Sequence, residues 1–302
     1  MRTQVKDREP NLRDAVFHLL GSGGKRLRPA LSLLAGKAVG ADIDKLVILA
    51  SAIELVHTAS LVHDDLIDGA LLRRGTPTLN SKWSSSATVL TGDFLFACSA
   101  RLAADTNSIP VMKQFADTVS ILADGEVKQM FSGPCRIDRE DYYKKIHAKT
   151  ASLFETCSLA AVMLGTEDPE ILNNMRQFGH DIGMAFQIID DVFDFTSDTT
   201  VLGKPVGNDI RQGLITLPTL FYIETNPQDP MVQILLTGKC IQDEEILQQF
   251  IQSITNSEAI AQSCDEARRF VNHGIQCLNS AVGVKEKQPL IELAEYIVSR
   301  ET

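Results

Sequence analysis

The 302-residue chain is 44% apolar and 23% charged, which is typical of soluble globular proteins and excludes a disordered or fibrous protein. It carries 29 Lys and Arg against 39 Asp and Glu, and the net charge of −10 argues against binding to nucleic acid or to an anionic membrane surface. An anionic ligand would therefore need a local cluster of basic residues.

Helices are predicted along almost the whole chain, because apolar residues recur at helical spacing and alternating strand patterns are scarce. The predicted helices cover residues 12–20, 30–39, 43–68, 87–104, 111–130, 139–164, 169–195, 215–223, 243–254, 258–278 and 285–298. The helix over 43–68 is apolar on most sides and is expected near the centre of the protein. No connection is long enough for an interdomain linker, so we expect one domain over residues 1–302.

The longest apolar stretch, residues 46–62, contains Glu54 and His57, so we expect no transmembrane segment. The first residues alternate in charge and lack an apolar core segment, which predicts a cytoplasmic protein without a signal peptide. His273 and Cys277 have helical spacing, but two residues alone do not make a metal site. The cysteines include no Cys-x-x-Cys pair and are expected to be buried thiols rather than zinc ligands or a disulfide framework. They are Cys98, Cys135, Cys157, Cys240, Cys264 and Cys277.

An Asp-Asp-x-x-Asp pattern occurs twice, each time in a predicted helix. Its members are Asp64, Asp65 and Asp68, and Asp190, Asp191 and Asp194. A helix turns by about 100° per residue, so the three carboxylates of each copy share one sector and repel one another. Apolar residues surround them, so a cation must neutralise the charge. Oxygen ligands without His or Cys are typical of Mg²⁺, which completes its shell with water and substrate phosphate. A phosphorylated substrate is therefore predicted.

Basic residues follow or precede these acidic motifs in three places: residues 25–28, residues 73–74 and Lys204. Each alone is typical of a solvated surface, as is a single Asp-Asp-x-x-Asp pattern. A diphosphate bound to metal ions, however, needs compensating cations. The run 25–28 also precedes Pro29 at a predicted helix start, where an anion is favoured. Together the motifs predict a diphosphate site.

In this order and spacing, the motifs resemble those of the trans-isoprenyl diphosphate synthases, also called the polyprenyl synthetase family. The resemblance covers nearly the whole chain. Its pieces are residues 23–29, His57, the first acidic motif with residues 73–75, Gly92 with Asp93, Lys149 with Thr150, Phe186 and Gln187 with the second acidic motif, and residues 203–205. The resemblance implies an all-α, single-domain helical bundle of the isoprenoid synthase type with a central active-site cavity.

The resemblance also implies a reaction, in which isopentenyl diphosphate is added to an allylic diphosphate to give an all-trans polyprenyl diphosphate. It implies three Mg²⁺ ions held mainly by Asp64, Asp68 and Asp190, with the other three aspartates in support. The residues implied at the allylic diphosphate are Arg73, Lys149, Gln187 and Lys204, with the Thr150 oxygen facing the new carbocation. The residues implied to hold isopentenyl diphosphate are Lys25, Arg28, His57 and Arg74.

Product length in this family depends on side chains one turn before the first acidic motif, where bulky residues block the pocket. Ala59 and Ser60 stand there and are small, so a C30 to C40 product is expected, with geranylgeranyl or farnesyl diphosphate as the alternative. Leu214 replaces a lysine that many relatives carry, which removes one implied phosphate contact.

Three other classes of protein share some of these features. A terpene cyclase has no second diphosphate to bind, and Lys25, Arg28 and Arg74 argue against it. A squalene-synthase-like enzyme would not carry the loop at residues 23–29. A non-catalytic partner subunit of a heteromeric synthase would have lost acidic or basic residues, yet all six aspartates are present. The resemblance implies a homodimer, for which the apolar face of residues 87–102 is the candidate contact.

Overall fold

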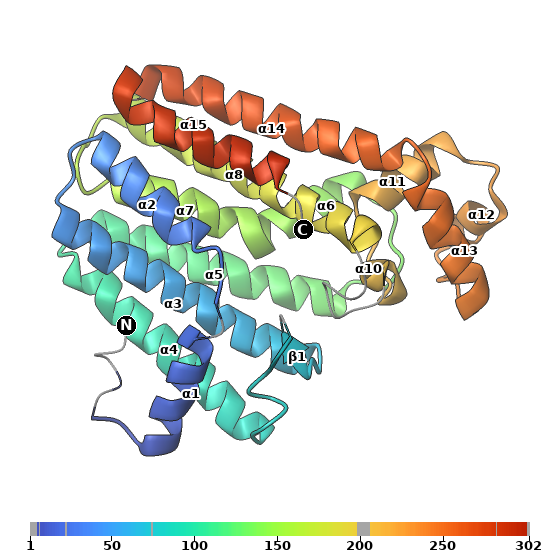
Figure 1. Cartoon of the computed structure of the whole chain (residues 1–302), viewed down its shortest axis with the longest axis horizontal. Helices are drawn as coiled ribbons and strands as arrows, with labels where there is room; N and C mark the ends of the chain where they lie inside the picture. Colours follow the sequence, from blue (N-terminus) through green and yellow to red (C-terminus); the bar gives the residue numbers. More distant parts are fainter. Residues whose placement is uncertain are drawn as a thin grey trace. The chain divides into compact units, whose positions relative to one another are not determined.

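The computed structural model of the chain describes residues 5, 7–21, 23–73, 75–197, 206–281 and 283–300 (Figure 1). Helices make up almost all of the regular structure in this part of the chain, which confirms the all-α class. The helices are α1 (Pro10–Gly21), α2 (Leu27–Ala38), α3 (Ile43–Ile67), α4 (Ser85–Asp105), α5 (Ile109–Phe131), α6 (Arg139–Ile146), η2 (His147–Ala151), α7 (Ser152–Val162), α8 (Pro169–Thr196), α10 (Asn208–Arg211), α11 (Leu217–Thr225), α12 (Pro230–Leu236), α13 (Glu244–Thr255), α14 (Ala259–Ala281) and α15 (Val284–Ser299).

The chain groups into two compact units. Unit 1 consists of Met1–Val119, Thr156–Met175 and Ala281–Leu290. Unit 2 consists of Ser120–Glu155, Arg176–Ser280 and Ile291–Thr302. A single domain over 1–302, with a central cavity, stays a prediction.

Helix α3 is the core helix of unit 1, as its apolar surface predicts. Asp42 caps its start by accepting the backbone N–H of Asp44 at 2.9 Å. The helix packs against α2 and α4. Gly36 in α2 makes the first contact close, because a Cβ there would meet the Leu46 side chain. The first acidic motif lies at the end of α3, so this packing holds the motif in place within unit 1.

Glu54 and His57 do not make α3 too polar to pass for a membrane-spanning helix, contrary to the expectation from the sequence. Two helices, α3 and α4, are long and apolar enough to cross a membrane by length and composition. In α3, 61% of the apolar window is buried inside the protein, as expected for a core helix that passes the same test. The absence of a transmembrane segment therefore stays a prediction.

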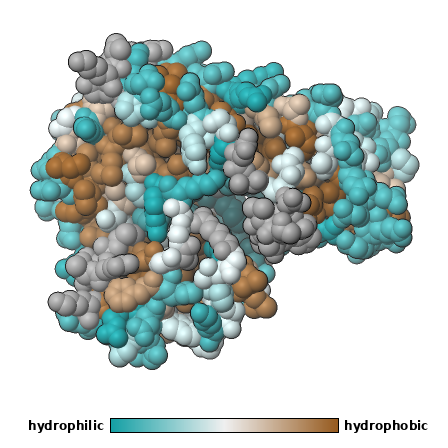
Figure 2. Space-filling model, in the orientation of Figure 1, coloured by the Kyte–Doolittle hydropathy of each residue, from teal (hydrophilic) through white to brown (hydrophobic). Residues whose placement is uncertain are grey.

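Several large apolar side chains reach the surface, and Figure 2 shows brown patches among teal ones on the visible face. In α4, Val89 and Leu90 are 39% and 67% exposed. In α5, Ile109 and Phe131 are 73% and 87% exposed. Single exposed apolar residues are normal on protein surfaces, and only a contiguous patch of them marks a protein–protein contact.

The single helix predicted over 139–164 is interrupted. It consists of α6, the π-helical turn η2 and α7. A π-turn inserts an extra residue into a helix and is frequent at functional sites. Two predicted site residues, Lys149 and Thr150, lie in this turn.

The shortest strands and helices were not predicted from the sequence. An antiparallel hairpin of β1 (Leu72–Arg73) and β2 (Thr76–Pro77) follows α3, and Gly75 in its turn has φ 71°. Helices α10 and α12 were also missed, because four and seven residues are too few to show a helical period.

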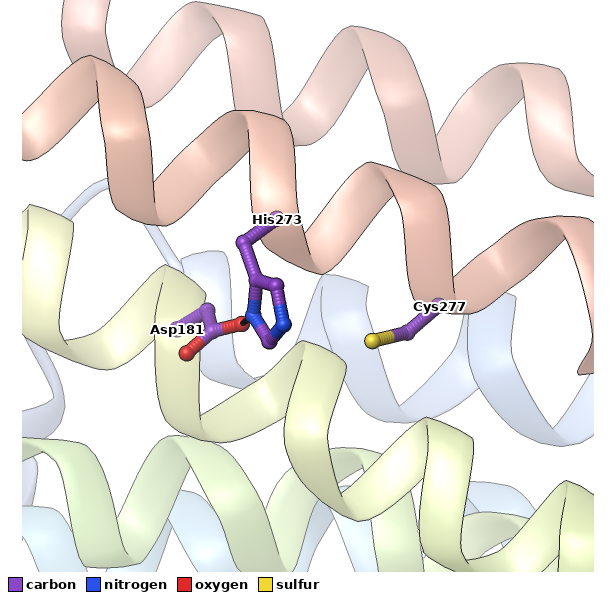
Figure 3. A group of neighbouring side chains, drawn as sticks. All are labelled: Asp181, His273 and Cys277. Atoms are coloured by element: carbon purple, nitrogen blue, oxygen red, sulfur yellow. Dashed lines mark hydrogen bonds and ion pairs between the residues drawn. The ribbon is translucent and has the colours of Figure 1, made fainter.

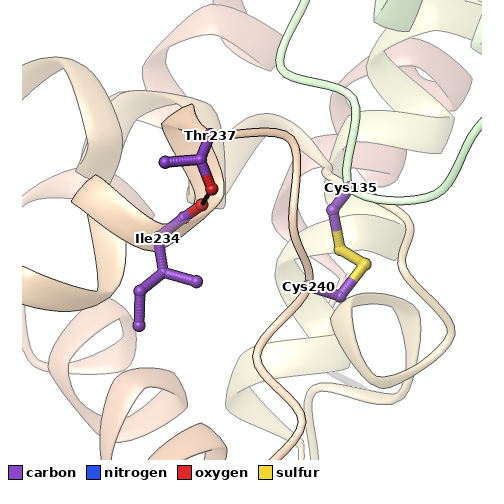
Figure 4. The surroundings of a disulfide bond; sticks show 4 residues. All are labelled: Cys135, Ile234, Thr237 and Cys240. Atoms are coloured by element: carbon purple, nitrogen blue, oxygen red, sulfur yellow. Dashed lines mark hydrogen bonds between the residues drawn. A yellow bond between two sulfur atoms is a disulfide. The ribbon is translucent and has the colours of Figure 1, made fainter.

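The expectation that all six cysteines are free thiols was wrong. Cys135, in the loop after α5, forms a disulfide with Cys240, in the loop after α12 (Figure 4). Both residues belong to unit 2, and their Cα atoms are 5.5 Å apart. Thr237 ends α12, and its hydroxyl donates a hydrogen bond to the Ile234 carbonyl in the last turn of that helix at 2.7 Å. The loop that carries Cys240 follows directly. The bond joins positions 105 residues apart, a pairing that spacing alone does not reveal.

Candidate active site

The first acidic motif lies at the carboxyl end of α3, in unit 1. Asp64 is half-buried, Asp65 is buried and Asp68 is exposed as the residue that ends the helix. Asp64 and Asp68 are one helical turn apart and thus share a face. Because the negative end of the helix dipole is here, the three carboxylates are unfavourably placed without a cation.

Arg73 from the hairpin that follows α3 neutralises one of these carboxylates. Its Nε donates to Asp65 Oδ1 at 2.8 Å. The turn between α3 and β1, in which Gly69 has φ 62° and the Ala70 N–H donates to the Asp65 carbonyl at 2.8 Å, brings Arg73 back to the end of α3. Arg74, the next residue of the predicted basic pair, lies outside the described residues.

A second basic group in unit 1 combines α2 and α3. Arg28 and His57 lie 3.2 Å apart, between Nη1 and Nε2. His57 precedes Asp64 by two helical turns, so both lie on one face of α3. Lys25 is exposed in the loop before α2, where Arg26 takes a left-handed conformation at φ 52° and pairs with buried Glu54. The predicted isopentenyl diphosphate residues Lys25, Arg28 and His57 thus lie on neighbouring elements of one unit.

The second acidic motif lies in the last two turns of α8, in unit 2, and a polar network surrounds its middle residue. Buried Asp191 accepts a hydrogen bond from Tyr142 Oη at 2.7 Å and from Gln187 Nε2 at 2.8 Å. Thr150 Oγ1 donates to Gln187 Oε1 at 2.6 Å. The predicted residues Thr150 and Gln187 are therefore linked to the motif through side-chain contacts.

Burial governs the ionisation of this network. Removal from water is the main cause that raises the pKa of Asp191 well above its usual range, and the charge of Asp209 adds to it. Removal from water also raises the pKa of Tyr142, with the Asp191 charge as the next cause. Tyr142 thus remains a hydrogen-bond donor, and Asp191 is held in place by its two partners.

Asp190 and Asp194 have different surroundings. Asp190 forms an ion pair with Arg300, whose guanidinium also stacks over the Phe186 ring at 4.2 Å. Asp194 accepts the backbone N–H groups of Asn208 and Asp209, both at 3.1 Å. These bonds tie the start of α10 to the motif.

Two predicted basic residues remain. Lys149 is exposed in the π-turn and lies 3.5 Å from Glu126 Oε2 of α5. Lys204 lies outside the described residues, as do Gly203 and Pro205 of the same segment. Leu214, at the position of the missing lysine, is half-buried.

The donor set fits a hard divalent cation. Each motif offers only carboxylate oxygens, which Mg²⁺ and Ca²⁺ prefer, and Asp64, Asp68, Asp190 and Asp194 remain accessible to solvent. Both sets stand at carboxyl ends of helices, where a cation offsets the dipole.

The sequence did not predict that Arg300 and Tyr142 contact the second acidic motif. Arg300 lies far along the chain from Asp190, and no local period links them. Tyr142 precedes the π-turn by less than two helical turns, but only the three-dimensional fold brings it to Asp191.

Comparisons with known proteins show which family the chain is similar to. A family model described as polyprenyl synthetase matches residues 9–254. The chain is 36% identical to a prenyl transferase of Synechocystis sp. over 99% of this chain and 93% of that protein. It is 36% identical to heptaprenyl diphosphate synthase component 2 of Bacillus subtilis over 98% and 84% of the two chains. The crystal structure of a Caulobacter crescentus polyprenyl synthase, complexed with calcium and isoprenyl diphosphate, aligns with a TM-score of 0.91 at 33% identity, over 100% of this chain and 92% of that one.

Proposed function

Because the chain belongs to the polyprenyl synthetase family, whose members transfer prenyl groups, we propose that it adds isopentenyl diphosphate to an allylic prenyl diphosphate and releases an all-trans polyprenyl diphosphate of C30 to C40. The observation that carries this proposal is the family match, which spans both acidic motifs and the basic loop before α2. The heptaprenyl relative supports a product in this range.

The six aspartates are proposed to bind three Mg²⁺ ions, mainly through Asp64, Asp68 and Asp190. When bound, the ions match the negative charge of the allylic diphosphate and make it a better leaving group. Asp191 is held by Tyr142 and Gln187, so its proposed part is to support its neighbours rather than to move.

The other residues are proposed to bind and orient the two substrates. Arg73 and Lys149 balance charge on the allylic diphosphate, and Lys25, Arg28 and His57 hold isopentenyl diphosphate. Loss of the allylic diphosphate breaks a C–O bond and leaves a carbocation, which the Thr150 oxygen stabilises. The double bond of isopentenyl diphosphate then forms the new C–C bond. A proton leaves to the released diphosphate, and the chain is five carbons longer.

The direct test incubates the purified chain alone with Mg²⁺, radiolabelled isopentenyl diphosphate and farnesyl diphosphate, followed by reverse-phase chromatography of the dephosphorylated products. We expect a polyprenol in the C30 to C40 range. A C20 product would instead identify a geranylgeranyl diphosphate synthase. Incorporation only after a second subunit is added would place the chain with heteromeric synthases, a possibility that the component 2 relative raises.

Product length is expected to respond to bulk at Ser60. Ala59 is completely buried in α3, so a large residue there would disturb the core, whereas Ser60 is half-buried and offers a cleaner site. Ser60→Phe should shorten the product by at least one isoprene unit in the same chromatographic assay. Val47→Phe is the matched control, because Val47 is 51% exposed on the same helix. An unchanged length in Ser60→Phe would exclude a tail that passes this position.

A homodimer and a cytoplasmic location are also proposed. Exposed Val89 and Leu90 of α4 support a contact between two copies, which sedimentation velocity measures. Cell fractionation tests the cytoplasmic location, and the Cys135–Cys240 bond would then be one of the rare disulfides of a reducing compartment.

A further inference from the structure

Tyr142 stands at one end of a chain of side-chain hydrogen bonds within unit 2, and Thr150 stands at the other. Tyr142 Oη donates to Asp191 Oδ2 at 2.7 Å, and Gln187 Nε2 donates to Asp191 Oδ1 at 2.8 Å. Thr150 Oγ1 donates to Gln187 Oε1 at 2.6 Å. Tyr142, Asp191 and Thr150 are buried, so water competes little for these bonds.

The chemistry of the groups sets the direction of the bonds next to Thr150. An amide NH₂ only donates, so Gln187 turns Nε2 toward the Asp191 oxygen and Oε1 toward Thr150. An amide oxygen only accepts, so Thr150 donates its one proton and presents its lone pairs to other partners. In the proposed reaction the partner is the allylic carbocation, which a lone pair attracts and a hydroxyl proton would repel.

The Tyr142 hydroxyl holds the Asp191 carboxyl group in the orientation that this chain of bonds requires. Each carboxyl oxygen receives one donor, from Gln187 of α8 and from Tyr142 of α6. Removal of the phenol donor would take one hydrogen bond from a buried oxygen, which is costly. The carboxyl group would then turn, and the Gln187 amide would follow it and leave Thr150 without a fixed acceptor.

The π-turn η2 lets Tyr142 and Thr150 reach the same neighbouring helix. Residues eight apart in an unbroken α-helix point about 80° away from each other. A π-turn has more residues per turn, so it rotates less per residue and reduces this angle. The partners Asp191 and Gln187 are one turn apart on α8 and thus share a face.

A second buried carboxylate of α8 has the same local pattern and provides an internal comparison. Gln177 Nε2 donates to Asp181 Oδ1 at 2.9 Å, and His273 Nδ1 lies 2.6 Å from Asp181 Oδ2 (Figure 3). Asp181 precedes Asp191 by ten residues, about 15 Å along the helix axis. The pair of Gln177 and Asp181 therefore shows that this pattern occurs away from the π-turn, and the link to Thr150 is what distinguishes the copy at Asp191.

We propose that Tyr142 is a positioning residue for prenyl transfer, whose hydroxyl acts through Asp191 and Gln187 to keep the Thr150 lone pairs toward the allylic carbocation. This inference rests on the proposed function and adds to it a residue that touches neither substrate.

The test compares two unreactive analogues of farnesyl diphosphate, titrated into the full chain in excess Mg²⁺ by isothermal titration calorimetry. One is a thiodiphosphate with an uncharged prenyl chain, and the other is an ammonium analogue whose positive nitrogen mimics the carbocation. Tyr142→Phe should weaken binding of the ammonium analogue by about fivefold or more and leave binding of the thiodiphosphate within about twofold. In steady-state assays kcat should fall by about tenfold, with the KM for isopentenyl diphosphate nearly unchanged.

A double-mutant cycle tests whether Tyr142 acts through Thr150. In a Thr150→Val background, Tyr142→Phe should not weaken binding of the ammonium analogue further, because the lone pairs that it positions are already gone. Tyr143→Phe is the matched control, since Tyr143 is the next residue of α6 and its Oη donates to Glu266 at 3.1 Å. His273→Ala is the control for the copy at Asp181, and both control variants should keep both affinities.

Several outcomes would overturn the proposal. They are an equal loss of both affinities in Tyr142→Phe, loss of its fold by circular dichroism, or its full effect in the Thr150→Val background. If the wild type binds the ammonium analogue more tightly and Tyr142→Phe keeps that preference, only this inference is wrong. A wild-type chain that binds neither analogue would overturn the proposed function as well.

Discussion

Asp68→Asn is expected to lower kcat for prenyl transfer by about two to three orders of magnitude while leaving the free energy of unfolding unchanged or slightly higher. Activity falls because a proposed metal ligand is lost. Stability does not fall, because Asp68 is an exposed carboxylate at the negative end of α3, where removing its charge is favourable by about 0.3–1 kcal/mol. Steady-state incorporation of isopentenyl diphosphate and urea unfolding measure the two quantities.

The opposite signs of the two effects distinguish a functional residue from a structural one. Asp117→Asn is the matched control, since Asp117 is exposed on α5 and the substitution removes the same charge. It should leave kcat within about twofold. If Asp68→Asn retained full activity, or lost activity and stability together, the proposed role of Asp68 would be wrong.

Cys135→Ser is expected to lower the free energy of unfolding by about 4 kcal/mol, the largest effect on stability that we predict. The disulfide closes a loop with a sequence separation of 105, and long loops gain most from a cross-link in the chain-entropy account. The loop is also anchored by the backbone N–H of Cys135, which donates to the Gly213 carbonyl at 2.7 Å. Urea unfolding under oxidising conditions measures the loss.

Cys264 of α14 is a free thiol, so Cys264→Ser is a control with the same change of side chain. Cys264→Ser should change the free energy of unfolding little. Addition of dithiothreitol should lower the stability of the wild type to that of Cys135→Ser and leave the variant as it was. Equal stability of wild type and Cys135→Ser without reductant would show that the cross-link does not contribute.

The features that depend on local sequence patterns were predicted correctly. The extent of α3 and the sharing of one face by Asp64 and Asp68 follow from a period of 3.6 residues, which the sequence displays directly. The family resemblance rested on the same short motifs, and the family match agrees with it.

Contacts between segments far apart in the chain could not be predicted from the sequence. The ion pair of Asp190 with Arg300 and the bond of Cys135 to Cys240 join positions about a hundred residues apart, and neither has a local signature. The π-turn at His147–Ala151 is equally hidden, because one inserted residue hardly changes the apolar pattern of a helix.

That π-turn has a consequence for protein engineering. Deleting one residue from His147–Ala151 would let an ordinary helix form, and the wide turn that carries Lys149 and Thr150 would be lost. Tyr142 lies before the turn and contacts Asp191, while Thr150 lies within it and contacts Gln187. The residues inside the turn would then point in new directions while Tyr142 before it keeps its place, so this segment should tolerate replacement of side chains far better than a change in its length.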